Sequence, residues 1–291
     1  MMNRRRFIAV SAAALAATGA EAAPLRWQGY AMGADVSLTL YGGTRADLDA
    51  ARSEIGRMET VFSVYDPASE LSRINAQGGG PLSPDSARLL AVCQRVHRAT
   101  GGLFDPTVQP VIRAALEDRA LPWHLVGWDR VRLTASHVHM GPGQEMTLNG
   151  IAQGYATDRV GDLLVARGFQ KALVAVGEHT AIGGPFRLGI EDPDHGMVGV
   201  RVLENHAIAT SSPGAMRIGP VTHIVDPKGP AAPQWSTITV EARSAALADG
   251  LSTALCHAPR DRIAEIARAT GTRVTLIAPD GKRATLGEPP L

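Results

Sequence analysis

The sequence predicts an α+β fold with a mainly antiparallel sheet and helices packed on it. Two observations carry this prediction: helical and strand-like patterns come in groups, and they do not alternate as βαβ units would require. A length of 291 residues, with 45% hydrophobic and 20% charged residues, is enough to bury a sizeable core. No repeat or low-complexity linker divides the chain, so we expect one domain over residues 23–291.

The N-terminal half is expected to be mainly helical after one strand. Alternating apolar residues predict a half-buried strand over 34–42. Helical spacing of apolar residues predicts a helix over 47–62. A second helix opens at Ser83, a good capping residue, and stops at the Thr-Gly-Gly of 100–102. A third is expected over 155–167.

The C-terminal half is expected to supply most of the sheet. Its β-rich stretches are separated by turn residues, and two helical stretches follow before a closing hairpin with a Pro-Asp-Gly turn. The expected strands are 171–177, 186–192, 198–211 and 236–242, the helices 247–256 and 260–269, and the hairpin 272–286.

Residues 1–22 have the features of a secretory signal peptide. A basic start, an alanine-rich apolar stretch and a small-residue end precede a predicted mature N-terminus near Ala23. Arg4 and Arg5 resemble the twin-arginine motif. No cysteine follows the apolar stretch, so an N-terminal lipid anchor is not expected. These features predict a periplasmic protein exported by the twin-arginine pathway.

Charge and cysteine content narrow the function classes. The 29 Lys and Arg balance 28 Asp and Glu, so bulk charge does not indicate a nucleic-acid partner. No apolar run reaches the roughly 18 residues needed to span a membrane. Cys93 and Cys256 both fall in apolar helical patterns, which favours buried free thiols over a disulfide.

Common nucleotide-binding and hydrolase motifs are missing, but three segments with turns or loops could contact a ligand. Tyr65, in "FSVYDPASELSRIN", is either a core residue or a ring that stacks on a flavin or adenine. The turn "GGLFDPTVQP" (101–110) is either a structural corner or a source of backbone contacts. The loop "TLNGIAQGYATD" (147–158) runs into a helix whose N-terminus suits a phosphate, and Gly150 and Gly154 permit close backbone approach.

Two further segments carry titratable groups. "THIVDP" places His223 in or beside a strand and Asp226 at a turn, where a structural and a catalytic role are both open. In "LADGLSTALC", Asp249 and Thr253 are four residues apart and therefore share one helix face. A carboxylate and a hydroxyl there could bind Mg²⁺, which prefers oxygen ligands. The alternative is an aspartate satisfied by neighbouring backbone amides.

The order of these five segments resembles the ApbE family of FAD:protein FMN transferases, over about residues 30 to 280. Finer features, "VGE" at 176–178 and "AIATSSP" at 207–213 among them, resemble the NosX branch, which flavinylates the NosR regulator of nitrous-oxide reductase. The resemblance implies a T-fold-like domain that binds FAD with Mg²⁺. It also implies transfer of FMN to a Thr or Ser of a periplasmic or membrane-anchored NosR-like acceptor, with release of AMP.

The resemblance also implies roles for individual residues. Asp249, Thr253 and the Gly150 carbonyl would bind the metal, and His223 would lie by the acceptor hydroxyl. The chemistry adds that a neutral hydroxyl nucleophile profits from a nearby base, a role that suits His223, with Asp226 to orient it. The positions that match FAD contacts are Met32, Tyr65, Leu103, Phe104, Asp105, Thr147, Gln153 and Ile224.

Three positions depart from the common family pattern. Many members have Asp at Thr147 and Lys at Gln153, and Glu178 stands in a Gly-Glu-His where Gly-Gly-Asp or Gly-Gly-Asn is usual.

Two other functions stay open. One is a metal-dependent FAD pyrophosphatase, which would use Asp249, Thr253 and His223 with water as the nucleophile and give FMN and AMP. The other is a non-catalytic flavin carrier or assembly factor, which the altered Gln153 and Glu178 favour. Covalent FMN on the acceptor would distinguish the transferase from both.

Overall fold

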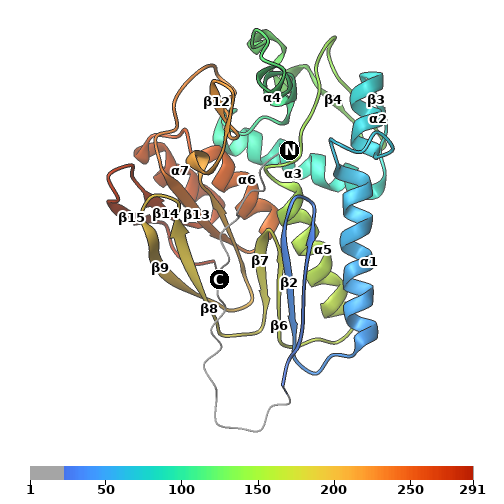
Figure 1. Ribbon diagram of the computed structural model, residues 1–291, viewed down its shortest axis with the longest axis vertical. Coiled ribbons are helices and arrows are strands. Elements are labelled where there is room, and N and C mark those ends of the chain that lie inside the picture. Colours follow the sequence, from blue (N-terminus) through green and yellow to red (C-terminus); the bar gives the residue numbers. More distant parts are fainter. Residues whose placement is uncertain (1–22, 291) are drawn as a thin grey trace.

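The computed structural model describes residues 23–290, and the predicted export signal with its cleavage site lies outside these residues. An eight-stranded sheet forms the centre, with every neighbouring pair antiparallel (Figure 1). In sheet order its strands are β1 (Leu25–Ala31), β2 (Ala34–Leu40), β6 (Ala172–Val176), β7 (Glu178–Ile182), β10 (Ala207–Ser211), β13 (Thr237–Ala242), β14 (Arg273–Ile277) and β15 (Arg283–Leu286).

Helices pack on one face of this sheet. Within the described residues the helices are α1 (Arg45–Phe62), α2 (Glu70–Gln77), α3 (Pro84–Thr100), α4 (Gln109–Leu116), α5 (Ala152–Ala166), α6 (Ala245–Leu255) and α7 (Arg260–Thr270). The central helices α5 and α6 lie against each other, α5 on β6 and β7 and α6 on β10 and β13, while α1 packs outside α5 (Figure 1). The predicted α+β class with an antiparallel sheet is confirmed.

Short strands complete the structure. A small sheet of β3 (Gly79–Pro81), β5 (His137–His139) and β4 (Arg132–Leu133) borders α2, and β11 (Arg217–Ile218) pairs with β12 (Val221–Thr222). The hairpin of β8 (Phe186–Asp192) and β9 (Gly196–Leu203) packs on the other face of the main sheet. Its Phe186, Leu188 and Leu203 contact Leu173 and Ile208.

The sequence patterns locate most elements correctly. Ser83 caps α3 by accepting a hydrogen bond from Ser86 N, and Gly101 ends that helix with φ of 63°. The predicted single strand over 198–211 is wrong, because β9 ends at Leu203 and β10 joins a different sheet. The break falls at a polar turn where Asn205 adopts φ of 55°, a conformation that Asn tolerates better than most residues.

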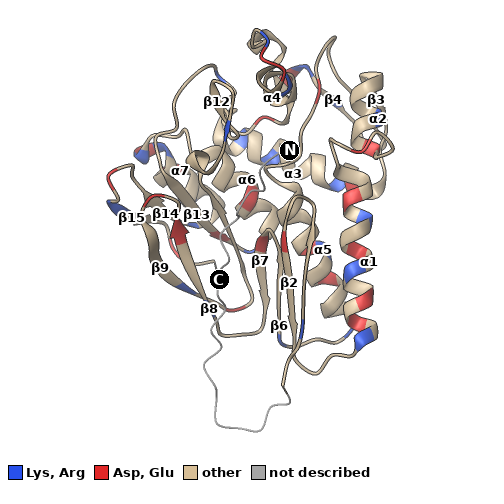
Figure 2. Ribbon diagram, viewed as in Figure 1, with Lys and Arg blue, Asp and Glu red and all other residues tan. Residues whose placement is uncertain are grey.

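The core explains the apolar character of α6. Nearly all of this helix is buried, and its one charged residue is Asp249 (Figure 2). Cys93 and Cys256 are buried and free, so the prediction of free thiols is confirmed. In residues 23–290 no helix has the length and apolar character of a membrane span.

Candidate functional site

The site forms where the N-terminus of α5 meets α6. Gly154 allows this approach, because a Cβ at this position would lie 2.3 Å from the Ala245 carbonyl oxygen and 2.8 Å from Asp249 Cβ. Its backbone N–H donates to Asp249 Oδ2 at 2.9 Å. A glycine in "NGIAQG" thus permits a direct bond between the loop segment and the carboxylate that the sequence singled out.

A second glycine brings a hydroxyl and a carbonyl to the same place. Thr253 Oγ1 donates to the Gly150 carbonyl at 3.3 Å. A Cβ on Gly150 would lie 2.9 Å from Thr253 Oγ1, so glycine permits this contact. Thr253 lies one helical turn after Asp249. The structure therefore brings together the three predicted metal ligands, Gly150, Asp249 and Thr253.

The three oxygens fit a hard cation. In the described part of the chain, the Asp249 carboxylate takes one hydrogen bond, on Oδ2, so Oδ1 is available to a metal. The alternative for Asp249, a carboxylate whose oxygens are satisfied by neighbouring backbone amides, would require more than this one hydrogen bond. A carboxylate, a hydroxyl and a backbone carbonyl are oxygen donors of the kind that Mg²⁺ prefers. In residues 23–290 no group of three or more His, Cys, Asp or Glu could hold a metal.

Burial dominates the electrostatics of the site. Asp249 is 3% exposed, and its burial raises the pKa to about 7 despite the hydrogen bond from Gly154. Burial also raises the pKa of Glu178 well above its usual value, and the charge of Asp249 adds to this effect. Glu178 accepts a hydrogen bond from Thr210 N at 3.0 Å. Two buried carboxyl groups close together favour a bound cation, which would offset their charge.

Asp158 is a structural part of the site that sequence reasoning missed. Its Oδ1 accepts from Ala245 N at 2.7 Å, and its Oδ2 accepts from Ala246 N at 2.9 Å and from Ser244 Oγ at 2.7 Å. This carboxylate of α5 therefore caps α6 and fixes one helix against the other. Ser244 at a helix start was a detectable signal, but its partner is 86 residues away.

The β1–β2 turn holds Met32 in an unusual conformation. Its φ is 52°, which costs a residue with a side chain roughly 1–2 kcal/mol. Glu59 Oε1 accepts a hydrogen bond from Met32 N at 2.9 Å. Gln153 Nε2 donates to the Met32 carbonyl at 3.0 Å. Gln153, a predicted FAD contact, thus uses its amide nitrogen on the protein's own backbone.

The Leu103–Phe104–Asp105 turn is a rigid corner that also borders a cavity. Asp105 Oδ1 accepts from Thr107 N and Oγ1, and its Oδ2 accepts from Trp128 N. The carboxylate therefore holds the surrounding loops in place, and Leu103 and Phe104 are buried.

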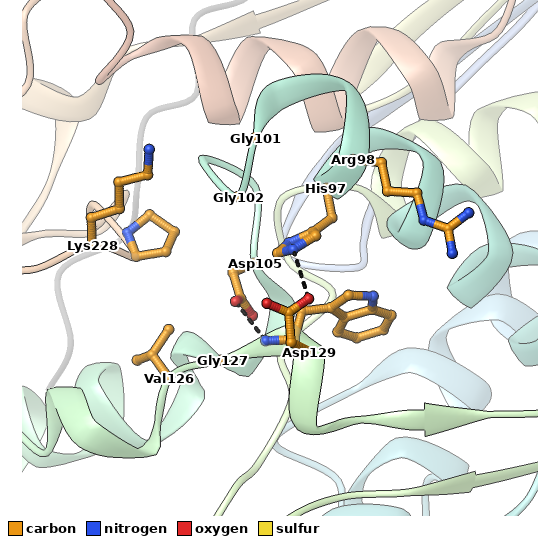
Figure 3. A pocket seen from close by; sticks show the side chains of 11 residues that line it. His97, Arg98, Gly101, Gly102, Asp105, Val126, Gly127, Asp129 and Lys228 are labelled. Atoms are coloured by element: carbon orange, nitrogen blue, oxygen red, sulfur yellow. Dashed lines mark hydrogen bonds and ion pairs between the residues drawn. The ribbon is translucent and has the colours of Figure 1, made fainter.

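A cavity of about 400 Å³ separates this turn from the loop after β12 (Figure 3). Gly101, Gly102 and Asp105 line one side, and Pro227 and Lys228 line the other. The cavity thus lies between the segments 101–110 and 222–227, which are distant in the sequence.

The other predicted cofactor contacts lie on loops. Tyr65 is 70% exposed just after α1, so the alternative that it is a core residue is wrong. Thr147 donates its backbone N–H to the Pro106 carbonyl at 2.8 Å and so lies beside the "GGLFDP" turn. Ile224 is buried on the loop after β12.

His223 directly follows β12. Its backbone N–H donates to the Met216 carbonyl at 3.0 Å, and its ring Nδ1 lies 3.2 Å from the same oxygen. Asp226 Oδ1 accepts from Lys228 N at 2.9 Å and shapes the turn that borders the cavity. The Met216 carbonyl is therefore an orienting group for His223 that the sequence did not indicate.

Fold and site together define a class: an α+β protein in which a buried carboxylate, a hydroxyl and a backbone carbonyl meet beside a helix N-terminus. The sequence profile of the ApbE family matches residues 32–277. The chain belongs to the ApbE family.

Curated relatives agree with this assignment. A protein of Haemophilus influenzae is 29% identical over 274 residues, covering 80% of this chain and 78% of its own. One of Salmonella typhimurium is 25% identical over 273 residues, covering 79% and 76%. Both relatives are named FAD:protein FMN transferase.

Solved structures share the fold. The flavin transferase ApbE of Vibrio cholerae has a TM-score of 0.79 at 24% identity and covers 90% of this chain and 97% of its own. The ApbE protein of Thermotoga maritima has a TM-score of 0.81 at 22% identity, with the same coverage of 90% and 97%. These likenesses extend over nearly the whole described chain.

Proposed function

We propose that this chain, a flavin transferase by its family, moves FMN from FAD to a Thr or Ser hydroxyl of an acceptor protein and releases AMP, with Mg²⁺ at the site. One observation carries the proposal: Gly154 and Gly150 bring the buried Asp249 carboxylate, the Thr253 hydroxyl and a carbonyl oxygen together. The names of the curated relatives support the same reaction.

The donor oxygens of Gly150, Asp249 and Thr253 fit Mg²⁺ in kind. When bound, Mg²⁺ would neutralise charge on the pyrophosphate of FAD. The chain's own groups prepare the site: the Gly154 N–H orients Asp249, and the Asp158 carboxylate fixes the start of α6. The N-terminus of α5 adds a positive dipole end that favours phosphate.

The proposed flavin contacts come from several loops and turns. Tyr65 offers an exposed ring for stacking, and Met32 is held in a conformation that a folded protein keeps only when its surroundings enforce it. The other proposed contacts are Leu103, Phe104, Asp105, Thr147 and Ile224, of which Asp105 and Thr147 shape the turn.

His223 is proposed as the base. If Nδ1–H donates to the Met216 carbonyl, Nε2 is the basic nitrogen of the ring. Nε2 would accept the proton of the acceptor hydroxyl as its oxygen attacks the FMN phosphorus. The bond between that phosphorus and the bridging oxygen then breaks, and AMP leaves with the electron pair. Asp226 supports this loop through its hydrogen bond to Lys228 N.

We also propose that the reaction takes place in the periplasm on a NosR-like acceptor. Arg4 and Arg5 in the N-terminal sequence, and the segments 176–178 and 207–213, support this part of the proposal. Export is tested by changing Arg4 and Arg5 to Lys together, which is expected to keep the protein out of the periplasmic fraction. Unchanged export would contradict the twin-arginine route.

The transferase activity is tested with purified protein, FAD, Mg²⁺ and a NosR-like acceptor domain. Mass spectrometry is expected to show FMN on one Thr or Ser of the acceptor. Modification is expected to be lost without Mg²⁺ and in Asp249→Asn and Thr253→Val. The control Asp194→Asn changes an exposed side chain in the turn between β8 and β9 and is expected to leave modification unchanged. Free FMN with an unmodified acceptor would show a pyrophosphatase, and intact FAD would indicate a carrier.

A further inference from the structure

We propose that Glu59 and Gln153 are positioning residues that clamp the Met32–Gly33 turn from both sides. The inference rests on the proposed function, in which Met32 contacts FAD. It assigns Gln153 a role on the protein's own backbone, where the family's lysine would offer a cationic contact to the cofactor. Glu59 has no role in the proposed reaction.

The turn needs an external restraint. Ala31 pairs with Ala34, so Met32 and Gly33 form a two-residue hairpin loop, with φ of 52° and 77°. Such a loop requires positive φ at both central residues and is usually built from Asn and Gly. Gly33 adopts this conformation without cost, but Met32 does not. Local preference therefore favours opening at Met32.

Two side chains supply the restraint, one on each side of Met32. Glu59, on α1, accepts from the backbone N–H at 2.9 Å. Gln153, on α5, donates to the backbone carbonyl at 3.0 Å. The residues are 27 and 121 positions away from Met32, so the restraint forms only in the folded protein.

Gln153 also connects the turn to the metal side of the site. The next residue, Gly154, donates its backbone N–H to Asp249 Oδ2. The Gln153 carbonyl accepts from Thr157 Oγ1 at 2.9 Å, and a Cβ on Gly177 would lie 2.7 Å from Gln153 Oε1. The backbone and the side-chain amide of Gln153 are therefore both held in place. Two consecutive residues of α5 thus set the position of Met32 and of Asp249, so the clamp aligns the proposed flavin contact with the proposed metal ligands.

The test compares variants that remove or keep each hydrogen bond. Glu59→Leu and Gln153→Leu remove an acceptor and a donor. Glu59→Gln keeps an acceptor without charge, and Gln153→Lys keeps a donor. Glu265→Leu is the matched control, because Glu265 is an exposed helical residue paired with the surface Arg262.

Two readouts need no acceptor protein. One is hydrogen exchange of the Met32 amide in the purified chain, and the other is FAD affinity measured by flavin fluorescence. Losing one hydrogen bond is expected to speed exchange and weaken FAD binding about fivefold in each Leu variant. Glu59→Gln and the Glu265→Leu control are expected to stay within about twofold of the parent in both readouts. Gln153→Lys is expected to stay within about twofold of the parent in Met32 exchange, because it keeps a donor to the Met32 carbonyl.

Three outcomes would overturn the clamp. Unchanged Met32 exchange in both Leu variants would show that the bonds do not restrain the turn. FAD binding weakened as much by Glu59→Gln as by Glu59→Leu would assign Glu59 an action through charge. Weaker FAD binding in Gln153→Leu with unchanged exchange would make Gln153 a direct cofactor contact. Exchange is measured without FAD, so a failure of flavin transfer leaves this test intact.

Discussion

Replacing Asp249 with Asn is expected to stabilise the protein when no metal is present, and to abolish flavin transfer when Mg²⁺ is present. Burial raises the pKa of this carboxyl from 3.8 to about 7. A pKa higher by about 3 corresponds to about 4 kcal/mol between the two protonation states. The native state binds more protons than the unfolded state between pH 4 and 7, so stability falls as pH rises through this window and the full cost is present above pH 7.

Asn keeps an acceptor for Gly154 N and carries no charge beside Glu178. At pH 8 in EDTA, Asp249→Asn is expected to raise stability by about 3 kcal/mol, which is roughly 5 °C or more in Tm for a chain of this size. The parent's Tm should fall between pH 5 and pH 8 more steeply than that of the variant. Thermal unfolding measures both, with Asp194→Asn, at an exposed turn between β8 and β9, as the control. A variant less stable than the parent at pH 8 without metal would contradict the cost assigned to the buried charge.

Three further predictions concern the scaffold. Gly154→Ala places a Cβ 2.3 Å from the Ala245 carbonyl and is expected to cost about 3 kcal/mol in urea unfolding; a loss below about 1 kcal/mol would contradict the close approach. Glu241 lies between two arginines and a histidine; burial opposes its ionisation, but hydrogen bonds lower its pKa overall. Glu241→Gln is therefore expected to lower the free energy of unfolding by about 3 kcal/mol near neutral pH. The difference between parent and variant should shrink as pH falls through the lowered pKa of Glu241, and a difference that is equal at all pH values would contradict this prediction. Burial raises the pKa of both Cys93 and Cys256, so a thiol reagent should label neither in the folded protein and both in denaturant; labelling under native conditions would contradict their burial.

Local patterns predicted the elements well because their signals lie within a few residues. Caps such as Ser83, turn glycines and apolar spacing predicted α3, and the four-residue separation placed Asp249 and Thr253 on one helix face. The strand predicted over 198–211 failed because pattern alone does not show that a polar turn sends its two halves to different sheets.

The contacts that support the site could not be predicted from local sequence patterns. Asp158 caps a helix 87 positions later, and Gln153 reaches the Met32 carbonyl across 121 positions. Neither residue type signals such a contact by itself, because the partners, which are mostly backbone atoms, come near only in the folded protein. The positive φ of Met32 is likewise enforced by tertiary hydrogen bonds against local preference.

The oxygens of Gly150, Asp249 and Thr253 are proposed to hold the metal at which FAD reacts. Anomalous diffraction from crystals grown with FAD and Mn²⁺, a divalent ion of similar preference, tests it directly. One strong peak in contact with all three oxygens is expected, and it should be lost in Asp249→Asn. A peak bound elsewhere, or one that persists in the variant, would rule out this metal site.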